Sequence, residues 1–185
     1  MTTNRPEPPA EDGDSGARTA LPTVGVPSAQ RRRMSLIVAI GGLVLATDIA
    51  TKTWAVQSLS TDPISLLGGA LVLTERRNPG AAFGLGTSLT PLLAAVAIVA
   101  VIMLAVAARR PHSRPVAVAL GLALGGAAGN LADRLLRSPG PMRGHVVDWI
   151  DIGSWPTFNL ADSALMIALV CGASIALRTA RRSTP

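Results

Sequence analysis

After its first 33 residues, the chain alternates between long apolar segments and short polar stretches. The apolar segments cover residues 34–56, 89–108, 116–132 and 160–177. Each is close to the roughly 20 residues that a helix needs to cross a bilayer. The pattern therefore predicts a mainly α-helical integral membrane protein with four transmembrane helices.

A different pattern separates the first two apolar segments. The stretch ISLLGGALVLTERRNPGAAFG, residues 64–84, has β-favouring residues around Gly68 and Gly69, followed by a turn signal in residues 78–80. We expect a small hairpin or sheet here, lying at the outer membrane surface. The sequence shows no internal repeat, which argues against the inverted-repeat design of many transporters.

Composition agrees with a membrane protein. Of 185 residues, 49% are apolar and only 15% are charged, which is too apolar for an ordinary soluble domain of this size. The net charge of +6 would suit a nucleic acid partner, but all except one of the 17 basic residues are arginine and most lie just outside apolar segments. Membrane topology explains them better, so no nucleic acid partner is expected.

The arginines also predict the orientation. Four crossings place both ends of the membrane domain and the loop between the second and third helices on one side. These parts hold nine arginines, namely Arg31, Arg32, Arg33, Arg109, Arg110, Arg114, Arg178, Arg181 and Arg182. Because positive charge favours the cytoplasmic side, both termini are expected there, and residues 59–88 and 135–159 are expected on the outer side.

The chain divides into three parts. Residues 1–33 are rich in proline and have little apolar surface to bury, so we expect a disordered cytoplasmic tail. Residues 34–178 form the membrane domain, and residues 179–185 form a basic cytoplasmic tail. The arginines before the first apolar segment give it a likeness to a signal peptide, but the segment continues to Val56 without a cleavage site, which favours a retained helix.

Two aspartates stand where a polar stretch leads into the last apolar segment. Asp148 and Asp162 lie fourteen positions apart, and carboxylates at a membrane boundary are energetically costly. Two carboxyl groups brought together can share one proton, so that one acts as an acid and the other as a base on water. An aspartyl protease is therefore one hypothesis.

The surroundings of the two aspartates differ. Asp162 would be the third residue of a helix capped by Asn159, where its charge meets the helix dipole favourably. Asp148 follows Val146 and Val147, a setting that raises its pKa by desolvation. Spacing alone leaves an aspartyl pair and simple helix capping both open. If the pair exists, we expect Asp162 to be its more acidic member.

Further polar residues lie in or near the apolar segments. Asp48 and Lys52 are spaced i, i+4, which allows an ion pair that neutralises both charges. Lys52 is the only lysine, and no serine motif accompanies it, which disfavours a Ser/Lys protease. Cys171 lies within the last apolar segment and suits a packing role, whereas His112 lies in the cytoplasmic loop. Cys/His and Ser/His catalysis are therefore poorly supported.

The run GGAAGNLADR closes the third apolar segment. Its glycines, Gly125, Gly126 and Gly129, permit the close approach of a neighbouring helix. Its polar residues can share a helix face and orient a group beside them; they are Asn130, Asp133 and Arg134.

Four short motifs occur in order along the chain: NPGAAFG, GNLADR, GHVVDW and FNLADS, at residues 78–84, 129–134, 144–149 and 158–163. Together with DIATK in the first apolar segment, they resemble lipoprotein signal peptidase, or signal peptidase II, over residues 34–178. The resemblance implies a protease of the bacterial plasma membrane that removes signal peptides from prolipoproteins, immediately before a cysteine carrying diacylglycerol. It also implies a β cradle and a short surface helix on the outer face.

The resemblance assigns roles residue by residue. The catalytic aspartates fall on Asp148 and Asp162, and the same role is not expected of Asp48, Asp133 or Asp151. The residues that support the active site or bind substrate fall on Asp48, Lys52, Asn78, Gly129, Asn130, Asp133, Arg134, Asn159 and Ala161. The family needs no metal or organic cofactor, and the sequence supplies no metal-ligand cluster. The implied partners are a lipidated prolipoprotein and membrane lipids, and a monomer is expected.

The chain departs from the family pattern in three places. These are the proline-rich tail, the long LLRSPGPMRG connection after Arg134, and the short link between Asp148 and Phe158. In addition, Trp149 stands where the family more often has phenylalanine, and we expect it to preserve an apolar wall. No motif residue is lost.

Two other classes of protein compete with a protease. A proton-coupled carrier would relay protons through several aspartates, but such a relay should span the bilayer, and these aspartates all lie toward one side. They are Asp48, Asp133, Asp148 and Asp162. A noncatalytic membrane protein that binds lipid or peptide would use the same packing motifs.

Overall fold

Four long helices form the body of the protein. The computed structural model describes residue 1, residues 28–80 and residues 89–183. Within these residues the long helices are α1 (Ser28–Ser58), α2 (Thr90–Ala108), α3 (Arg114–Leu136) and α4 (Leu160–Ser183). Each is long and apolar enough to cross a membrane, which confirms the predicted four-helix membrane fold.

Helix α3 is the centre of the bundle, because it packs against α1, α2 and α4. Its glycines allow these contacts to be very close. A Cβ atom on Gly125 would lie 2.6 Å from the carbonyl oxygen of Gly41 in α1. A Cβ atom on Gly126 would lie 2.6 Å from the carbonyl oxygen of Ala161 in α4. The predicted role of these glycines in helix packing is therefore confirmed.

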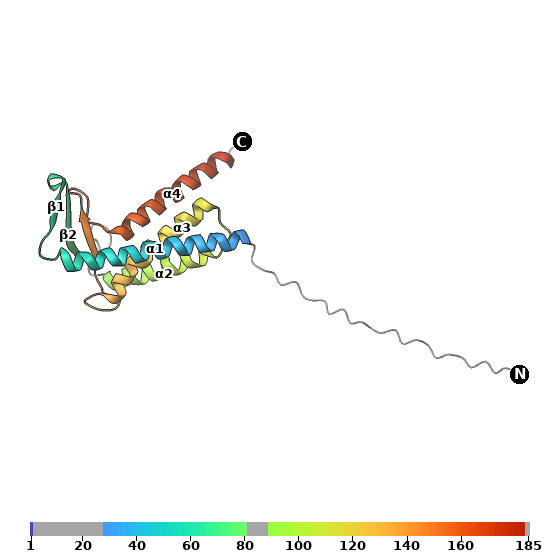
Figure 1. Cartoon of the computed structure of the whole chain (residues 1–185), viewed down its shortest axis with the longest axis horizontal. Coiled ribbons are helices and arrows are strands. Elements are labelled where there is room, and N and C mark those ends of the chain that lie inside the picture. The colour runs from blue at the N-terminus through green and yellow to red at the C-terminus, as the bar shows by residue number, and fades with distance from the viewer. Residues whose placement is uncertain (2–27, 81–88, 184–185) are drawn as a thin grey trace.

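A three-stranded antiparallel sheet lies across one end of the bundle (Figure 1). Its strands are β1 (Ile64–Leu66), β2 (Leu71–Asn78) and β3 (Val146–Asp151), in the order β1-β2-β3. The expected hairpin is formed by β1 and β2, and the 3-10 turn η1 (Leu67–Gly69) connects them. Strand β3 was not predicted from its own sequence. It forms because the GHVVDW motif pairs with the distant strand β2.

The hairpin turn requires glycine, because Gly68 and Gly69 have φ angles of 67° and 93° in the left-handed region. Beyond β2, residues 81–84 of the NPGAAFG motif lie outside the described residues. The same holds for residues 2–27 of the predicted N-terminal tail.

The first helix begins earlier than predicted. Helix α1 starts at Ser28, so the arginines placed in the tail form its first turns. The loop between α2 and α3 binds this part of α1. The side-chain amide of Gln30 donates to the carbonyl oxygen of Arg109 at 3.1 Å, and the Arg33 guanidinium donates to that of His112 at 3.2 Å. Arginine also favours helix, so nothing in this stretch ends α1 at the edge of its apolar segment.

The last helix continues past its predicted end. Residues 179–183 were expected to form a tail, yet they belong to α4, which ends at Ser183. Arginine and alanine are strong helix formers, so the helix does not stop where the apolar segment does. In Figure 1, α4 diverges from α1 and α2 toward its C-terminal end. There, α3 and α4 leave an apolar groove of about 670 Å³ between them, lined by residues such as Leu120, Ala123 and Ala173.

We call the end that carries the sheet the sheet end and the opposite end the arginine end. The arginine end contains the nine arginines of the α1 start, the α2–α3 loop and the α4 terminus. Its small apolar core consists of Ile37, Ala108 and Ala117, all buried. All candidate site residues with described positions lie toward the sheet end.

Candidate active site

Asp148 lies on β3, the strand that the pattern did not predict. Its side chain is 4% exposed and both carboxyl oxygens accept hydrogen bonds. The Asn78 amide on β2 donates to Oδ2 at 3.1 Å, and the Asn159 amide donates to Oδ1 at 2.7 Å. The sheet therefore fixes Asp148 from one side and the residue before α4 fixes it from the other.

Asp162 lies in the first turn of α4 and takes part in its cap. The Asp162 N–H donates to the Asn159 side-chain oxygen at 2.9 Å, and the Asn159 N–H donates to Asp162 Oδ2 at 3.3 Å. This reciprocal arrangement is a capping box, so the predicted capping by Asn159 is confirmed. The other carboxyl oxygen, Oδ1, accepts from the Asn130 amide of α3 at 2.7 Å. Asp162 thus caps the helix and also presents its carboxyl group to a pocket.

The two aspartates, hereafter the carboxyl pair, are joined through two asparagines. The Asn159 amide that binds Asp148 also donates to the Asn130 side-chain oxygen at 3.2 Å. Asn130 in turn binds Asp162. The sequence resemblance placed all four residues in one site, and the structure connects them by hydrogen bonds.

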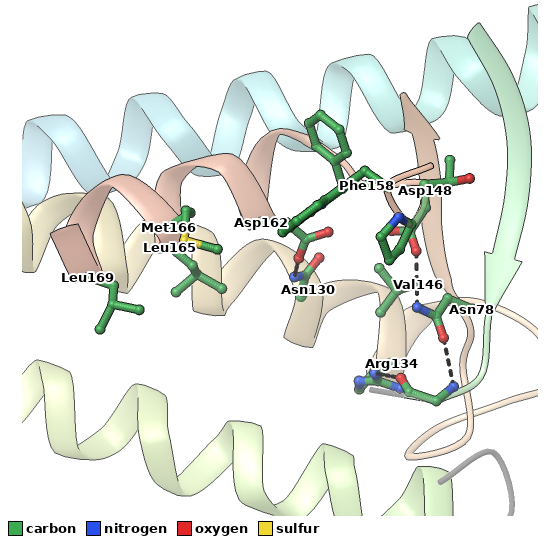
Figure 2. A pocket seen from close by; sticks show the side chains of 14 residues that line it. Asn78, Asn130, Arg134, Val146, Asp148, Phe158, Asp162, Leu165, Met166 and Leu169 are labelled. Carbon is green, nitrogen blue, oxygen red and sulfur yellow. Dashed lines mark hydrogen bonds between the residues drawn. The ribbon is translucent and has the colours of Figure 1, made fainter. Parts of the chain in front are cut away.

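The carboxyl pair lines a pocket of about 450 Å³. Figure 2 shows both carboxyl groups beside Phe158, with apolar side chains continuing along α4. The polar lining residues include Asn78, Asn130, Arg134, Asp148 and Asp162. The apolar lining residues include Val146, Trp155, Phe158, Leu165, Met166 and Leu169. Leu169 and Met166 are more than half exposed on the outside of α4, so the pocket opens toward the surface that a membrane helix turns to lipid.

Burial and charge change the acidity of Asp148. Desolvation by burial, followed by the nearby negative charge of Asp162, raises the pKa of Asp148 from 3.8 to about 6. The hydrogen bonds from Asn78 and Asn159 and the charge of Lys52 act in the opposite direction but are weaker. At mildly acidic pH, Asp148 can therefore hold a proton beside Asp162, which is the requirement for one acid and one base on the same water.

A buried ion cluster supports the carboxyl pair. Asp48 and Lys52 of α1 are both fully buried, with Lys52 Nζ 2.7 Å from Asp48 Oδ2. The same Nζ lies 3.0 Å from Asp133 Oδ2 and donates to the Asn130 side-chain oxygen at 2.8 Å. The predicted ion pair is present, but neutralisation is only part of its role. Lys52 also fixes the asparagine that binds Asp162.

The same cluster holds the backbone around both aspartates. Asp48 Oδ1 accepts the Ala161 N–H at 2.9 Å, next to Asp162. Asp133 Oδ2 accepts the Val147 N–H at 3.1 Å, next to Asp148. Gly129 makes room for this, because a Cβ atom there would lie 2.5 Å from Asp48 Oδ2. Gly129 and Ala161 therefore belong to the site through their small size and backbone rather than through functional side chains.

Arg134 is the remaining polar residue of the GNLADR motif. Only 8% of it is exposed, and its Nη2 donates to the Gly80 carbonyl oxygen at 2.6 Å (Figure 2). Its Nη1 has no hydrogen-bond partner among the described residues, and the side chain lines the pocket. Arg134 therefore brings a positive charge to the wall beside the carboxyl pair.

Other predicted or rejected residues lie away from the pocket. Trp149 does not line it; the ring packs edge to face on Trp54 of α1, with centroids 5.6 Å apart, and against the buried apolar cluster of Ala55, Leu59 and Val147. Asp151 is the last residue of β3, and Arg76 Nη2 lies 3.5 Å from its Oδ2. Neither His112 nor Cys171 lines the pocket. Across residue 1 and residues 28–80 and 89–183, no three His, Cys, Asp or Glu side chains gather as a metal ion would require.

Sequence reasoning missed two parts of the site. Trp155 and Pro156 come from the short link before α4 and form part of the pocket wall, yet no motif marks them. Arg137, just beyond GNLADR, forms an ion pair with Asp133. The i, i+4 spacing of Asp133 and Arg137 was the available signal for that pair.

Comparison with known proteins finds consistent relatives. Residues 40–178 match the family described as Signal peptidase (SPase) II. A protein named lipoprotein signal peptidase from Rhodococcus jostii is 45% identical over 164 residues, covering 88% of this chain and 78% of the relative. One of the same name from Mycolicibacterium smegmatis is 41% identical over 165 residues, covering 89% of this chain and 67% of the relative.

Two solved structures of bacterial membrane enzymes share the fold. The first has a TM-score of 0.71 and 26% identity and covers 81% of this chain and 92% of its own. The second has a TM-score of 0.65 and 29% identity and covers 77% of this chain and 92% of its own. The structural similarity thus extends over more than three quarters of the chain.

Proposed function

Because the chain belongs to the signal peptidase II family, whose members cleave signal peptides from prolipoproteins, we propose that it is an aspartyl endopeptidase. The observation that supports this mechanism best is the linkage of Asp148 and Asp162 through Asn159 and Asn130 at one pocket. No other described pair of ionisable groups is joined in this way within the pocket.

The environments of Asp148 and Asp162 suggest which of the two acts as the acid and which as the base. Burial favours a proton on Asp148, which makes Asp148 the acid of the pair and leaves Asp162 as its base. Asp162 takes a proton from water as the water oxygen attacks the scissile carbonyl. Protonated Asp148 donates a hydrogen bond to the carbonyl oxygen as negative charge develops on it. Asp148 later helps to protonate the leaving amine.

The shape of the pocket suits a substrate anchored in lipid. Its apolar wall along α4 continues to side chains that are exposed on the membrane-facing surface, such as Met166 and Leu169. A diacylglyceryl group on the substrate cysteine would remain in lipid while the adjacent peptide bond reaches the carboxyl pair. We therefore propose cleavage immediately before the lipidated cysteine.

The charge distribution supports one orientation. The nine arginines gather at the arginine end, which we assign to the cytoplasm of a bacterial cell with the enzyme in its plasma membrane. Both chain termini then lie in the cytoplasm and the sheet end faces outward. A proton relay through the bilayer is disfavoured, because the buried acids among the described residues all lie near the sheet end, as the contacts of Asp48 and Asp133 with α4 and β3 require.

The test is a cleavage assay with purified protein in detergent and a prolipoprotein peptide whose cysteine carries diacylglycerol. Mass spectrometry of the products would identify the cleaved bond. Matched reactions would use the unlipidated peptide and the variants Asp148→Asn and Asp162→Asn. Asp151→Asn is the control, because it makes the same chemical change on the same strand but outside the pocket.

We expect the parent and Asp151→Asn to release the signal peptide from the lipidated substrate alone, and both pair variants to lose activity by about a thousandfold or more. Cleavage that persists in either pair variant would contradict the aspartyl mechanism. Binding of the peptide by the parent without cleavage would favour the noncatalytic alternative.

A further inference from the structure

The charges of the motif residues in the site do not sum to zero, because carboxyl groups outnumber cations. Contacts or electrostatic interactions join four carboxyl groups, those of Asp48, Asp133, Asp148 and Asp162, to the cations Lys52 and Arg134. One proton shared by the carboxyl pair still leaves one negative charge. An unbalanced charge in a buried site at a membrane boundary is costly.

Arg137 supplies the missing positive charge. It follows α3 as its C-cap residue, and its Nε forms an ion pair with Asp133 Oδ1. The Asp133 carboxylate is only 6% exposed, so this pair differs from an ordinary surface contact between helix neighbours. With Arg137 included, four carboxylates, three cations and one shared proton sum to zero.

Asp133 connects Arg137 with both members of the carboxyl pair. Its second oxygen, Oδ2, accepts the Val147 N–H at 3.1 Å, one residue before Asp148. The same oxygen lies 3.0 Å from Lys52 Nζ. Lys52 binds the asparagine that donates to Asp162. The position of the Asp133 carboxylate therefore affects β3 and α4 together.

The backbone holds Arg137 in place for this contact. Its N–H donates to the Asp133 carbonyl oxygen at 3.0 Å. The chain then folds back so closely that a Cβ atom on Gly144 would lie 2.9 Å from the Arg137 carbonyl oxygen. Gly144 also donates its N–H to the Arg134 carbonyl oxygen at 3.1 Å. The long connection after α3 thus closes over the end of the helix and keeps Arg137 beside Asp133.

We propose that Arg137 is a positioning residue of the carboxyl pair, acting through Asp133 to balance the charge of the site and to set the geometry of both aspartates. This role rests on the proposed peptidase function. Arg137 does not line the pocket, so it does not touch the substrate there. Without it, the site can restore its charge balance by binding a second proton, which would leave the carboxyl pair without its base.

The test compares three variants in the lipidated-peptide assay over a range of pH. Arg137→Gln removes the charge, and Arg137→Lys keeps it. Arg143→Gln is the control, since it removes an exposed arginine from the same connection. Thermal unfolding in detergent and elution on gel filtration would establish that each variant is folded.

For Arg137→Gln we expect kcat to fall roughly tenfold while KM stays within about twofold, because the reacting groups rather than the binding surface are displaced. Its pH optimum should move upward by roughly half a pH unit, since losing a nearby cation favours protonated carboxyls. Arg137→Lys should keep the parental pH optimum. Arg143→Gln should match the parent in all three quantities.

If the ion pair between Arg137 and Asp133 were purely structural, Arg137→Gln would lower stability without moving the pH optimum. That result, or equal kinetics of Arg137→Gln and Arg143→Gln, would overturn the role of Arg137. If Arg137→Gln does not fold, Arg137→His replaces it. The His variant should lose rate relative to the parent as pH rises through about 6.5, where imidazole loses its charge, and a ratio independent of pH would equally refute the proposal. Failure of the parent to cleave would instead contradict the proposed function.

Discussion

The sheet end and the arginine end of the bundle differ in the burial of their charged side chains, several of which are buried at the first, whereas most are exposed at the second. At the sheet end, Asp48 and Lys52 are fully buried and bind groups from α3 and α4. At the arginine end, side chains such as Arg32 and Arg182 are exposed. Burying charge is costly in a membrane protein. Among the described residues, charged side chains are therefore buried only around Asp148 and Asp162.

The packing of α3 against α4 also differs between the two ends, and it is closer at the sheet end. Toward the sheet end, α3 and α4 meet at Gly126 and Ala161 with almost no space for a side chain. Toward the arginine end, the same helices leave an apolar groove, and Gly172 has no neighbouring atom within 4 Å of an added Cβ. Between α3 and α4, close packing is thus concentrated beside Asp162, whereas α3 stays close to α1 farther along, where a Cβ atom on Gly121 would lie 2.9 Å from Ile40 Cβ.

Lys52→Met is expected to have the largest effect of the variants that test the difference between the sheet end and the arginine end. Removing the cation leaves Asp48 and Asp133 buried together, and breaking a buried pair costs about 3–5 kcal/mol. We expect a large fall in the thermal unfolding temperature in detergent, or failure to obtain folded protein, and no cleavage. Arg32→Met is the matched control on the same helix and should change the unfolding free energy by less than about 0.5 kcal/mol. Equal stability of the two variants would show that the sheet end has no special dependence on charge.

A smaller effect is expected from the glycine packing. In Gly125→Ala the new Cβ would lie 2.6 Å from the Gly41 carbonyl oxygen and 2.7 Å from Val44 Cβ, so the helices must separate. We expect a loss of about 1–3 kcal/mol, measured by thermal or denaturant unfolding. Gly172→Ala makes the same change in open space and should be neutral or stabilising by up to about 1 kcal/mol, since alanine favours helix. Similar losses in both would contradict the difference in packing.

Asp148→Asn should separate stability from activity. Because burial raises the pKa of Asp148 from 3.8 to about 6, the folded protein binds more protons than the unfolded chain between these values, so this group lowers stability as pH rises from 4 to 6. At pH 7 the asparagine variant should be more stable than the parent by about 1–2 kcal/mol, allowing for the altered hydrogen bond to Asn78. The measurement is thermal unfolding at pH 4 and pH 7.

The parent should show this loss of stability between the two pH values, and Asp148→Asn should lack most of it. Asp151→Asn is the control for replacing a carboxyl group with an amide on β3. A variant that is less stable than the parent at pH 7 would mean that the Asp148 carboxyl group stabilises the fold, contrary to its buried setting.

The smallest effect is expected at the arginine end. Arg182→Gln changes an exposed side chain in the last turn of α4, so the unfolding free energy should change by less than about 0.5 kcal/mol. Cleavage of the lipidated peptide should stay within about twofold of the parent, because the site lies at the other end of the bundle. A loss as large as that of Gly125→Ala would show that the two ends are energetically similar after all.

Much of the fold could be predicted because it depends on local features of the chain. Segment length and hydropathy specify the four membrane helices. Spacing along a helix predicts the Asp48 and Lys52 pair. Spacing also predicts the cap that Asn159 forms with Asp162. The helix ends were less predictable, since α1 and α4 continue through arginines that favour helix outside the apolar segments.

The motifs predicted which residues form the candidate site but not how these residues are connected. Asn78 and Asp148 are 70 residues apart, and Lys52 and Asn130 are 78 apart. No periodicity relates such positions. The pairing of β3 with β2 and the close packing of α3 on α1 and α4 bring them together. Local spacing therefore determined the helices and the candidate residues, whereas long-range pairing and packing decided which atoms meet, which carboxyl group is buried, and that Arg137 joins the site.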